Sequence, residues 1–412
     1  MTSEELRDIG PALAGFLGHF EQFFDNPEGV VHFRNYSRGL LSDLERKTAE
    51  PLAAYAGVPA RNVQQFLKAC VWDDHGLVDA VQAHLWSAIA KQPDDGLGTV
   101  AVFDETSAVK KGDKTPGVRR QFLGCLGKVD NGIVTVHLAA VKGGFKTLLD
   151  GELFLPKSWA DDRDRCDEAE IPKDMRHRPK WRIAFERFSR AHGNGWRFDW
   201  MTFDEGYGGK PKFLTLLDLT GQQYVGEVPK TFSCRTAGEA KKTGAEALFS
   251  RPGVRAGKAK AFAMSRQTGP ATVWQAKSIA VCLGDDVRAR HLLIKARNRE
   301  TGEVKYFIAR PNRRTGLRLL LRVGFTRWNV EHLFRVAKDE IGLTHFEGRS
   351  YVSLKRHLAL CLTVMAFVSL HTMRLREKKS GGDNGTGLPG AEAALPEVSE
   401  PATRNHGNPM PA

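Results

Sequence analysis

Two aspartates, Asp104 and Asp204, occupy equivalent places where carboxylates could hold a divalent metal ion. Asp104 follows the apolar, β-branched run 99–103, and Asp204 follows a second predicted strand, 197–203. We expect both strands to end there, which places each carboxylate at the edge of a sheet on a rigid backbone. Hard cations such as Mg²⁺ take oxygen ligands, so paired aspartates suit them. The alternative is that each aspartate only caps a turn, and the next residue is acidic in both cases and could take the same role: Glu105 and Glu205.

A third carboxylate, Glu331, lies on a predicted helix that spans residues 326–343. Arg327, Glu331, Arg335 and Lys338 are spaced four, four and three residues apart, which places them within an arc of about 80° on one helix face. The adjoining face is apolar: Val330, Leu333, Phe334, Ala337 and Ile341. One interpretation is a row of salt bridges on a solvated helix. The other is a metal-binding carboxylate whose neighbouring cations bind phosphate groups.

The positive charge of the chain is concentrated in two blocks. The 412 residues carry a formal net charge of +13, which favours a polyanionic partner, either nucleic acid or an anionic membrane surface. Residues 230–277 hold ten Lys and Arg against two acidic residues, and residues 295–327 again hold ten against two. Blocks so poor in acids indicate a surface that follows phosphates rather than an ordinary solvated face.

Other classes of protein are disfavoured by simpler features. The six cysteines lie far apart and form no C-x-x-C pair, which argues against a zinc module or a disulfide scaffold. The acidic, polar N-terminus is unlike a secretory signal. We expect the most apolar run, 358–370, to be too short to span a bilayer. Nucleic acid is therefore preferred over a membrane as the partner, and a cytoplasmic location is expected.

The pattern of elements predicts a mixed α/β fold in five segments. These are a helical DNA-binding domain, the first part of a catalytic core, a basic β-rich insertion, the last part of the core with Glu331, and a disordered tail: 1–95, 96–228, 229–292, 293–376 and 377–412. In the core, strands come first as a meander and then alternate with helices, which indicates a layered sheet. We expect 121–129 and 132–142 to be strands joined by a tight turn at Asp130-Asn131-Gly132.

The helical segment contains one pattern with two interpretations. Residues 51–67 read as a short apolar helix, a turn at Gly57 and a second amphipathic helix. This is the pattern of a helix-turn-helix, whose second helix can enter a major groove. It is equally the pattern of an ordinary helical hairpin, and the residues alone leave both open.

These motifs together resemble DDE transposases of bacterial insertion sequences, in the branch whose last motif runs Tyr-x2-Arg-x3-Glu-x6-Lys. Arg327, Glu331 and Lys338 match that spacing, while Gly324 stands at the tyrosine position. Five stretches are similar to landmarks of the group named for insertion sequence seven-oh-one: ERKTAEPLAAYAG from Glu45, WDD from Trp72, FDETSAVKKG from Phe103, TFDEGYG from Thr202 and RWNVEHLFRVAKDEIGLTHFEGRSY from Arg327.

The resemblance implies an RNase H-like catalytic core with a β-rich insertion between the second Asp and the Glu. It implies that Asp104, Asp204 and Glu331 hold two Mg²⁺ or Mn²⁺ ions, and that Arg327 and Lys338 contact DNA. Arg335, on the same helix face, is added as a DNA contact from its position. The motif position of Tyr207 has no assigned role.

The activity implied is two-metal-ion cleavage of double-stranded DNA at the ends of an insertion sequence, followed by joining of those ends to target DNA. A homodimer on paired ends, associated with the bacterial nucleoid, is the expected assembly. The alternatives are a domesticated transposase or structure-specific nuclease that cuts without integrating, and a non-catalytic DNA-binding protein. The intact set of Asp104, Asp204 and Glu331 argues against the last of these.

Overall fold

The computed structural model describes residues 3–382, apart from 255, 265–270, 285–287 and 289. As expected, the chain is helical before its first strand. The five helices of this part are α1 (Ser3–Gly18), α2 (Pro27–Leu41), α3 (Ala49–Ala56), α4 (Ala60–Lys68) and α5 (Asp74–Ile89). The predicted turn between α3 and α4 is present, because Gly57 adopts a left-handed conformation with φ of 68° and ends α3.

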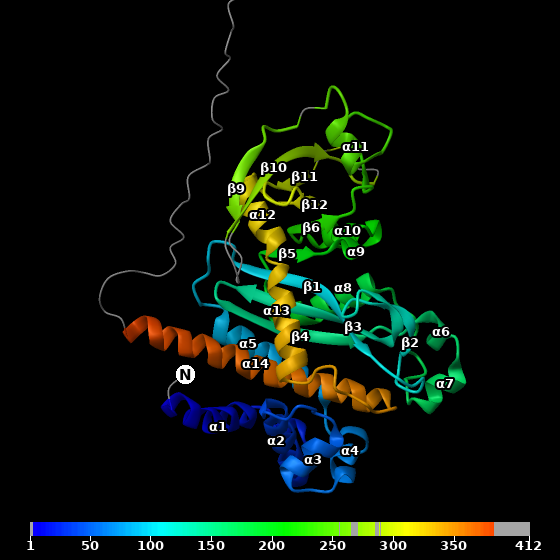
Figure 1. Ribbon diagram of the computed structural model, residues 1–412, viewed down its shortest axis with the longest axis vertical. Coiled ribbons are helices and arrows are strands. Elements are labelled where there is room, and N and C mark those ends of the chain that lie inside the picture. The colour runs from blue at the N-terminus through cyan, green and yellow to red at the C-terminus, as the bar shows by residue number, and fades with distance from the viewer. Residues whose placement is uncertain (1–2, 255, 265–270, 285–287, 289, 383–412) are drawn as a thin grey trace, which may run out of the picture.

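One mixed sheet forms the centre of the described chain (Figure 1). Its first strands are β1 (Thr99–Val109), β2 (Arg119–Leu123), β3 (Lys128–Lys142), β4 (Phe145–Leu153), β5 (Trp200–Phe203) and β6 (Tyr224–Val228). β3 pairs antiparallel with both β1 and β4, while β5 pairs parallel with β1 and β6 with β5. The order β4-β3-β1-β5-β6, with three antiparallel strands followed by two parallel ones, is the expected RNase H-like core.

The β-rich insertion is not a separate sheet but an extension of the central one. Its strands β9 (Lys260–Met264), β10 (Thr272–Val281), β11 (His291–Asn298) and β12 (Val304–Arg310) form an antiparallel meander, and β12 pairs with β6. The boundary expected at residue 292 falls at the start of β11, so the meander continues to Arg310. Before it lie a small ribbon and a short helix: β7 (Ser233–Cys234), β8 (Thr243–Gly244) and α11 (Ala245–Ser250).

Helices cover both faces of the sheet. The remaining helices are α6 (Lys157–Ala160), α7 (Arg163–Glu168), α8 (Lys180–Gly193), α9 (Glu205–Gly208), α10 (Pro211–Thr220), α12 (Leu317–Phe325), α13 (Trp328–Arg335), a π-helical turn η2 (Val336–Glu340) and α14 (Tyr351–Gly382). The ring of Phe103 packs against Tyr207 and Phe213 on the α9–α10 side. Its neighbour Asp104 meets Arg327 at the start of α13. Because successive strand residues alternate faces, α13 and α10 lie on opposite sides of the sheet.

The prediction of a tight turn at Asp130-Asn131-Gly132 is wrong. The chain turns earlier, where Leu126 and Gly127 donate backbone hydrogen bonds to Leu123, and residues 130–132 lie inside β3. The Asn131 side chain instead donates to the backbone carbonyls of Lys110 and Gly112. Gly132 is needed for close packing, since a Cβ there would lie 2.4 Å from the carbonyl oxygen of Ala108. Asn131 and Gly132, which are residue types common in turns, therefore stabilise the pairing of β3 with β1.

The helix α14 packs along the sheet and the N-terminal helices. By length and composition alone it could cross a membrane, so the apolar stretch is longer than the run at 358–370 suggested. Its side chains are, however, largely buried against β4, α5, α4 and α2, as in the core helix of a globular protein. Arg356 donates to the carbonyls of Leu67, Cys70 and Trp72, which holds the WDD motif in place. The helix continues to Gly382, and the rest of the expected disordered tail lies outside the described residues.

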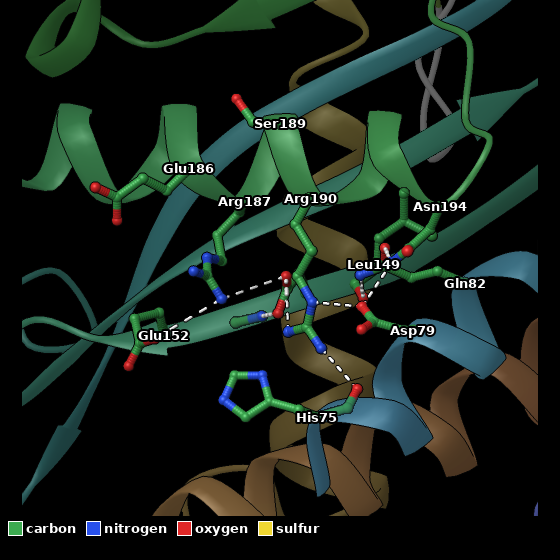
Figure 2. A network of polar contacts seen from close by, with 12 residues as sticks. His75, Asp79, Gln82, Leu149, Glu152, Glu186, Arg187, Ser189, Arg190 and Asn194 are labelled. Atoms are coloured by element: carbon green, nitrogen blue, oxygen red, sulfur yellow. Dashed lines mark hydrogen bonds and ion pairs between the residues drawn. The ribbon is translucent and has the colours of Figure 1, made fainter. Parts of the chain in front are cut away.

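A network of charged side chains attaches α8 to the sheet and to α5. Figure 2 shows Arg187 and Arg190 pointing from α8 toward β4 and α5. The buried Asp150 carboxylate lies 3.6 Å from Arg187 Nη1 and 3.4 Å from Arg190 Nη1. Arg187 also lies 3.7 Å from Glu152, and Arg190 donates to Asp79 over 2.6 Å. The network therefore links three elements behind the face that carries Asp104.

Candidate functional site

Asp104 and Asp204 are brought together by the register of two parallel strands. Phe103 of β1 pairs with Phe203 of β5, the last residue of that strand. Asp104 and Asp204 are the residues that follow, so they occupy equivalent positions on adjacent strands. Asp204 leaves the sheet as expected. The prediction that β1 also ends at Asp104 is wrong: β1 continues to Val109, because β3 continues to pair with it on the other edge.

Asp104 is a buried carboxylate under electrostatic strain. Its side chain is 15% exposed. Burial raises its pKa to about 6; Arg327 opposes this rise and the charge of Asp204 adds to it. One oxygen accepts a hydrogen bond from the backbone N–H of Glu105 at 2.8 Å, and the other lies 3.2 Å from Arg327 Nη1. The carboxylate is thus held in place while its negative charge is incompletely neutralised.

Asp204 caps the short helix α9. Its side chain accepts hydrogen bonds from the backbone N–H groups of Gly206 at 3.0 Å and Tyr207 at 3.3 Å. Gly208 allows α9 to touch β6, since a Cβ there would lie 2.0 Å from the carbonyl oxygen of Glu227. The motif DEGYG therefore fixes the direction in which the Asp204 side chain leaves the sheet.

Tyr207 lies buried beside this carboxylate pair. Burial raises the pKa of its phenol well above the ordinary value, and the charges of Glu105, Asp104 and Asp204 raise it further. The phenol oxygen has no hydrogen-bond partner among the described residues. This neutral hydroxyl lies on the Phe103 side of β1, and among the nearby charges that of Glu105 acts on it most strongly.

Glu331 is not brought into contact with the two aspartates in this structure. It lies on α13 with its side chain 65% exposed, and Arg327 stands between it and the sheet. Arg327 Nη1 is 3.2 Å from Asp104, while Arg327 Nη2 is 3.6 Å from Glu331. Accordingly, no group of three acidic, His or Cys side chains in the described chain is arranged to hold a metal ion. A guanidinium here links the first and third carboxylates of the predicted set.

The oxygen donors nevertheless fit a hard divalent cation. Asp104 and Asp204 follow paired residues of adjacent strands; burial raises the pKa of Asp104, Arg327 opposes the rise, and repulsion by the charge of Asp204 adds to it. A cation between the two carboxylates would relieve that repulsion. Glu331 is exposed, and it lies on a helix whose start is anchored to Asp104 through Arg327. We therefore retain all three residues as the candidate metal ligands.

The alternative carboxylates have other partners or positions. Glu105 faces the opposite side of β1 from Asp104 and forms an ion pair with Lys180 of α8. Glu205 is exposed as the first residue of α9. Gly324, at the tyrosine position of the last motif, is buried on α12, where a Cβ would lie 3.1 Å from the ring of Phe307. A tyrosine would not fit there in this packing, which gives the departure a physical reason.

A large basic cavity borders Glu331. It has a volume of about 900 Å³ and lies between α12–α13, β9 and the start of β1. Two of the predicted DNA contacts, Arg327 and Arg335, line it, and three further cations join them: Lys305, Arg318 and Arg322. The acids Asp95, Glu303 and Glu331 also line it, and Arg322 pairs with Asp95 and Lys305 with Glu303. Lys338 is not among its lining residues and lies with its ammonium 5.8 Å from the ring centre of Phe334. Sequence reasoning singled out the basic block but missed the individual residues, since only the fold shows which cations converge.

Removing the charge of Asp104 is expected to stabilise the metal-free protein. Its pKa is higher in the folded chain, about 6, than the ordinary 3.8. The folded state therefore binds this proton more tightly, and stability falls as pH rises from about 4 to about 6. We expect Asp104→Asn to be more stable than wild type by about 1–2 kcal/mol at pH 8, allowing for the lost partner of Arg327. Urea unfolding in EDTA at pH 8 and pH 4 measures this; an Asn variant that is less stable at pH 8 would contradict the assigned strain.

Comparisons with known proteins identify the family of this chain. A family model described as DDE superfamily endonuclease matches residues 19–300, a range that includes Asp104 and Asp204 and ends before Glu331. A protein of Microchaete diplosiphon named as probable transposase for insertion sequence element IS701 is 29% identical over 208 residues, which are 50% of this chain and 50% of that protein. The match thus spans about half the length of this relative. The resemblance to that group of transposases is confirmed.

A solved structure is also similar. The cryo-EM structure of the piggyBac transposase synaptic complex with hairpin DNA matches with a TM-score of 0.41 and 10% sequence identity. The match covers 89% of this chain and 78% of that chain.

Proposed function

Because this chain belongs to the DDE superfamily endonucleases, we propose that it is a transposase. It would cleave DNA at the ends of an insertion sequence and join those ends to target DNA. The observation that carries the proposal is the placement of Asp104 and Asp204 directly after the registered pair Phe103 and Phe203, with Arg327 linking Asp104 to Glu331.

Asp104, Asp204 and Glu331 are proposed to bind two divalent cations, Mg²⁺ or Mn²⁺. When bound, such ions activate a hydroxyl nucleophile and stabilise the leaving 3′ oxygen of a phosphodiester. The protein contributes a rigid frame: β1 and β5 fix two of the carboxylates, and the helix cap on Asp204 fixes its orientation.

The cations around the site are proposed to bind the DNA backbone. Arg327 would exchange its carboxylate partners for a phosphate, with Arg335 and Lys338 on the same helix extending the contact. The cavity beside Glu331, in which Lys and Arg outnumber Asp and Glu, would guide a strand toward the carboxylates. The exposed face of α4 could read the terminal repeat as the second helix of a helix-turn-helix. Action as a homodimer on paired ends, in the bacterial cytoplasm, stays a prediction.

The proposal is tested with a labelled duplex that carries the ends of the element. Wild-type protein is incubated with this duplex in Mg²⁺, Mn²⁺ or EDTA, and both cleavage and strand joining are measured. Metal-dependent cutting at the ends with joining to a second duplex supports a transposase. Cutting without joining would indicate a nuclease or domesticated enzyme, and tight binding without cutting in either metal would contradict catalysis.

Cations of the cavity are expected to contribute to DNA affinity through phosphates. We expect Arg318→Ala and Arg335→Ala each to weaken binding severalfold at 0.1 M salt, and to lower the slope of log affinity against log salt by about one. The matched control is Arg120→Ala, an exposed arginine of β2 at the far end of the sheet (Figure 1). Fluorescence anisotropy across a salt series measures both quantities. An unchanged salt slope in both cavity variants would show that DNA does not bind along the cavity.

A further inference from the structure

The motif lysine Lys47 is a buried cation whose ammonium donates only to main-chain oxygens. The residue is 2% exposed. Its ammonium donates to the carbonyls of Leu40 at 2.7 Å and Ser42 at 2.9 Å, at the end of α2, and to the carbonyl of Glu340. Three contacts use all three protons of the ammonium group. Such a buried charge is expensive to maintain, so its place calls for an explanation beyond solubility.

The Glu340 carbonyl is the end of the helix that carries Glu331. After α13 the helix widens into the π-helical turn η2, whose last residue is Glu340. The carbonyl ends of α2 and η2 both carry partial negative charge, and one ammonium between them stabilises both. Gly342 reverses the chain immediately afterwards, with φ of 81°, and a Cβ there would lie 2.9 Å from the Lys47 side chain. The helix is thus anchored at a defined axial position.

A second motif lysine holds the segment that follows. Lys110 comes directly after β1, the strand that carries Asp104, and its ammonium donates to the carbonyls of Thr344 and Phe346. The backbone N–H of Lys47 donates to His345 Nδ1 at 3.1 Å in the same segment. The chain beyond Glu331 is therefore held from two sides, by the N-terminal helices and by the Asp104 strand.

We propose that Lys47 is a positioning residue that, with Lys110, fixes the helix bearing Glu331 and Lys338 relative to Asp104 and Asp204. The start of α13 is already held through Arg327 and Asp104, and Lys47 holds its end. Since Lys47 spans from α2 to η2, the N-terminal helices set the position of the third carboxylate. The catalytic part of this inference rests on the proposed function.

The test compares Lys47→Met with a matched control, Lys142→Met. Lys142 is also buried, and its ammonium donates to the carbonyls of Ile89 and Ala90 at the end of α5 rather than to the Glu331 helix. Both substitutions remove a buried ammonium from a helix end, so both lower thermal stability. Any further difference between the two variants therefore reports on the position of the Glu331 helix rather than on overall stability.

Two readouts separate the positioning claim from the proposed function. Hydrogen exchange without DNA or metal is expected to be faster at the amides of residues 330–343 in Lys47→Met than in Lys142→Met. Cleavage of the labelled ends at saturating DNA is expected to fall about tenfold to a hundredfold in Lys47→Met, with a higher Mn²⁺ concentration for half-maximal rate and unchanged DNA affinity. Lys142→Met should cleave as wild type does, at a temperature where both are folded.

The outcomes are distinct. Equal exchange in the two variants would overturn the positioning claim, whatever the cleavage result. Faster exchange with unchanged cleavage and unchanged Mn²⁺ dependence would overturn the catalytic part of it. If wild type fails to cleave while Lys47→Met alone shows faster exchange, the proposed function fails and the structural anchor stands.

Discussion

Glu331→Gln is expected to lose DNA cleavage by about 10³-fold or more, while DNA affinity stays within about twofold of wild type. The amide keeps the size of the side chain but removes the negative charge that a divalent cation requires. DNA affinity is therefore expected to stay the same or to rise slightly, since the substitution removes a negative charge 3.6 Å from Arg327.

The matched control for this variant is Asp339→Asn. Asp339 is an exposed acid in η2, on the same helical segment as Glu331. The Asp339→Asn variant loses the same charge, and its cleavage rate should stay within about twofold of the wild-type rate. Single-turnover cleavage and anisotropy on the same labelled ends measure both properties. A Glu331→Gln variant that cuts at the wild-type rate would show that a different carboxylate completes the site, with Glu105 and Glu205 the next to test.

Arg187→Met is expected to destabilise the protein by about 3 kcal/mol. Asp150 is fully buried, and burial raises its pKa even though Arg187 and Arg190 lie within 4 Å. Without Arg187 the carboxylate keeps Arg190 alone, which it shares with Asp79. Figure 2 shows how both arginines reach down from α8 to this network. Incomplete neutralisation of the buried Asp150 charge, rather than lost packing, produces most of the effect.

The pH dependence of this variant has a definite sign. Because the folded pKa of Asp150 lies above its ordinary value, the folded state gains stability as pH falls and the carboxyl takes up its proton. The loss in Arg187→Met should therefore be larger at pH 8 than at pH 5. Arg182→Met is the control, since Arg182 is half-exposed on the same helix and pairs with Glu186; it should change stability by less than about 0.5 kcal/mol. Equal losses for the two arginines, by urea unfolding, would contradict the network.

Short-range patterns predicted the elements that carry the candidate site. The run before Asp104 is apolar and β-branched, and the run before Asp204 is apolar and aromatic, so both read as strands. The alternation of charge and apolar residues around Glu331 read as a helix, which the structure bears out as α13 and η2. In each case the signal lies within about ten residues and depends on local burial.

The predictions were wrong where pairing with a distant strand determines the local structure. β1 continues past Asp104 because β3, some thirty residues later, remains paired with it. Asp130-Asn131-Gly132 has the residues of a turn, yet Gly132 is there because the backbone of Ala108 approaches it. Neither fact is visible in the segment itself, since both depend on register between distant strands.

The spatial arrangement of the three carboxylates also could not be predicted from the sequence. Arg327 was expected to contact DNA, and its placement between Asp104 and Glu331 depends on how α13 crosses the sheet. The roles of Lys47 and Lys110 were hidden for the same reason. Each lies in a motif noted for its resemblance, but each donates to a carbonyl group more than 200 residues away, Lys47 to that of Glu340 and Lys110 to that of Phe346. Backbone acceptors carry no sequence signature.

The most direct test of the central claim is anomalous diffraction from crystals of the protein with Mn²⁺ and a duplex carrying the element's ends. The account predicts manganese between Asp104, Asp204 and Glu331, with Arg327 withdrawn from the carboxylates to a phosphate. Manganese bound elsewhere, or held by the two aspartates with Glu331 still paired to Arg327, would contradict the claim that these three residues form one catalytic metal site.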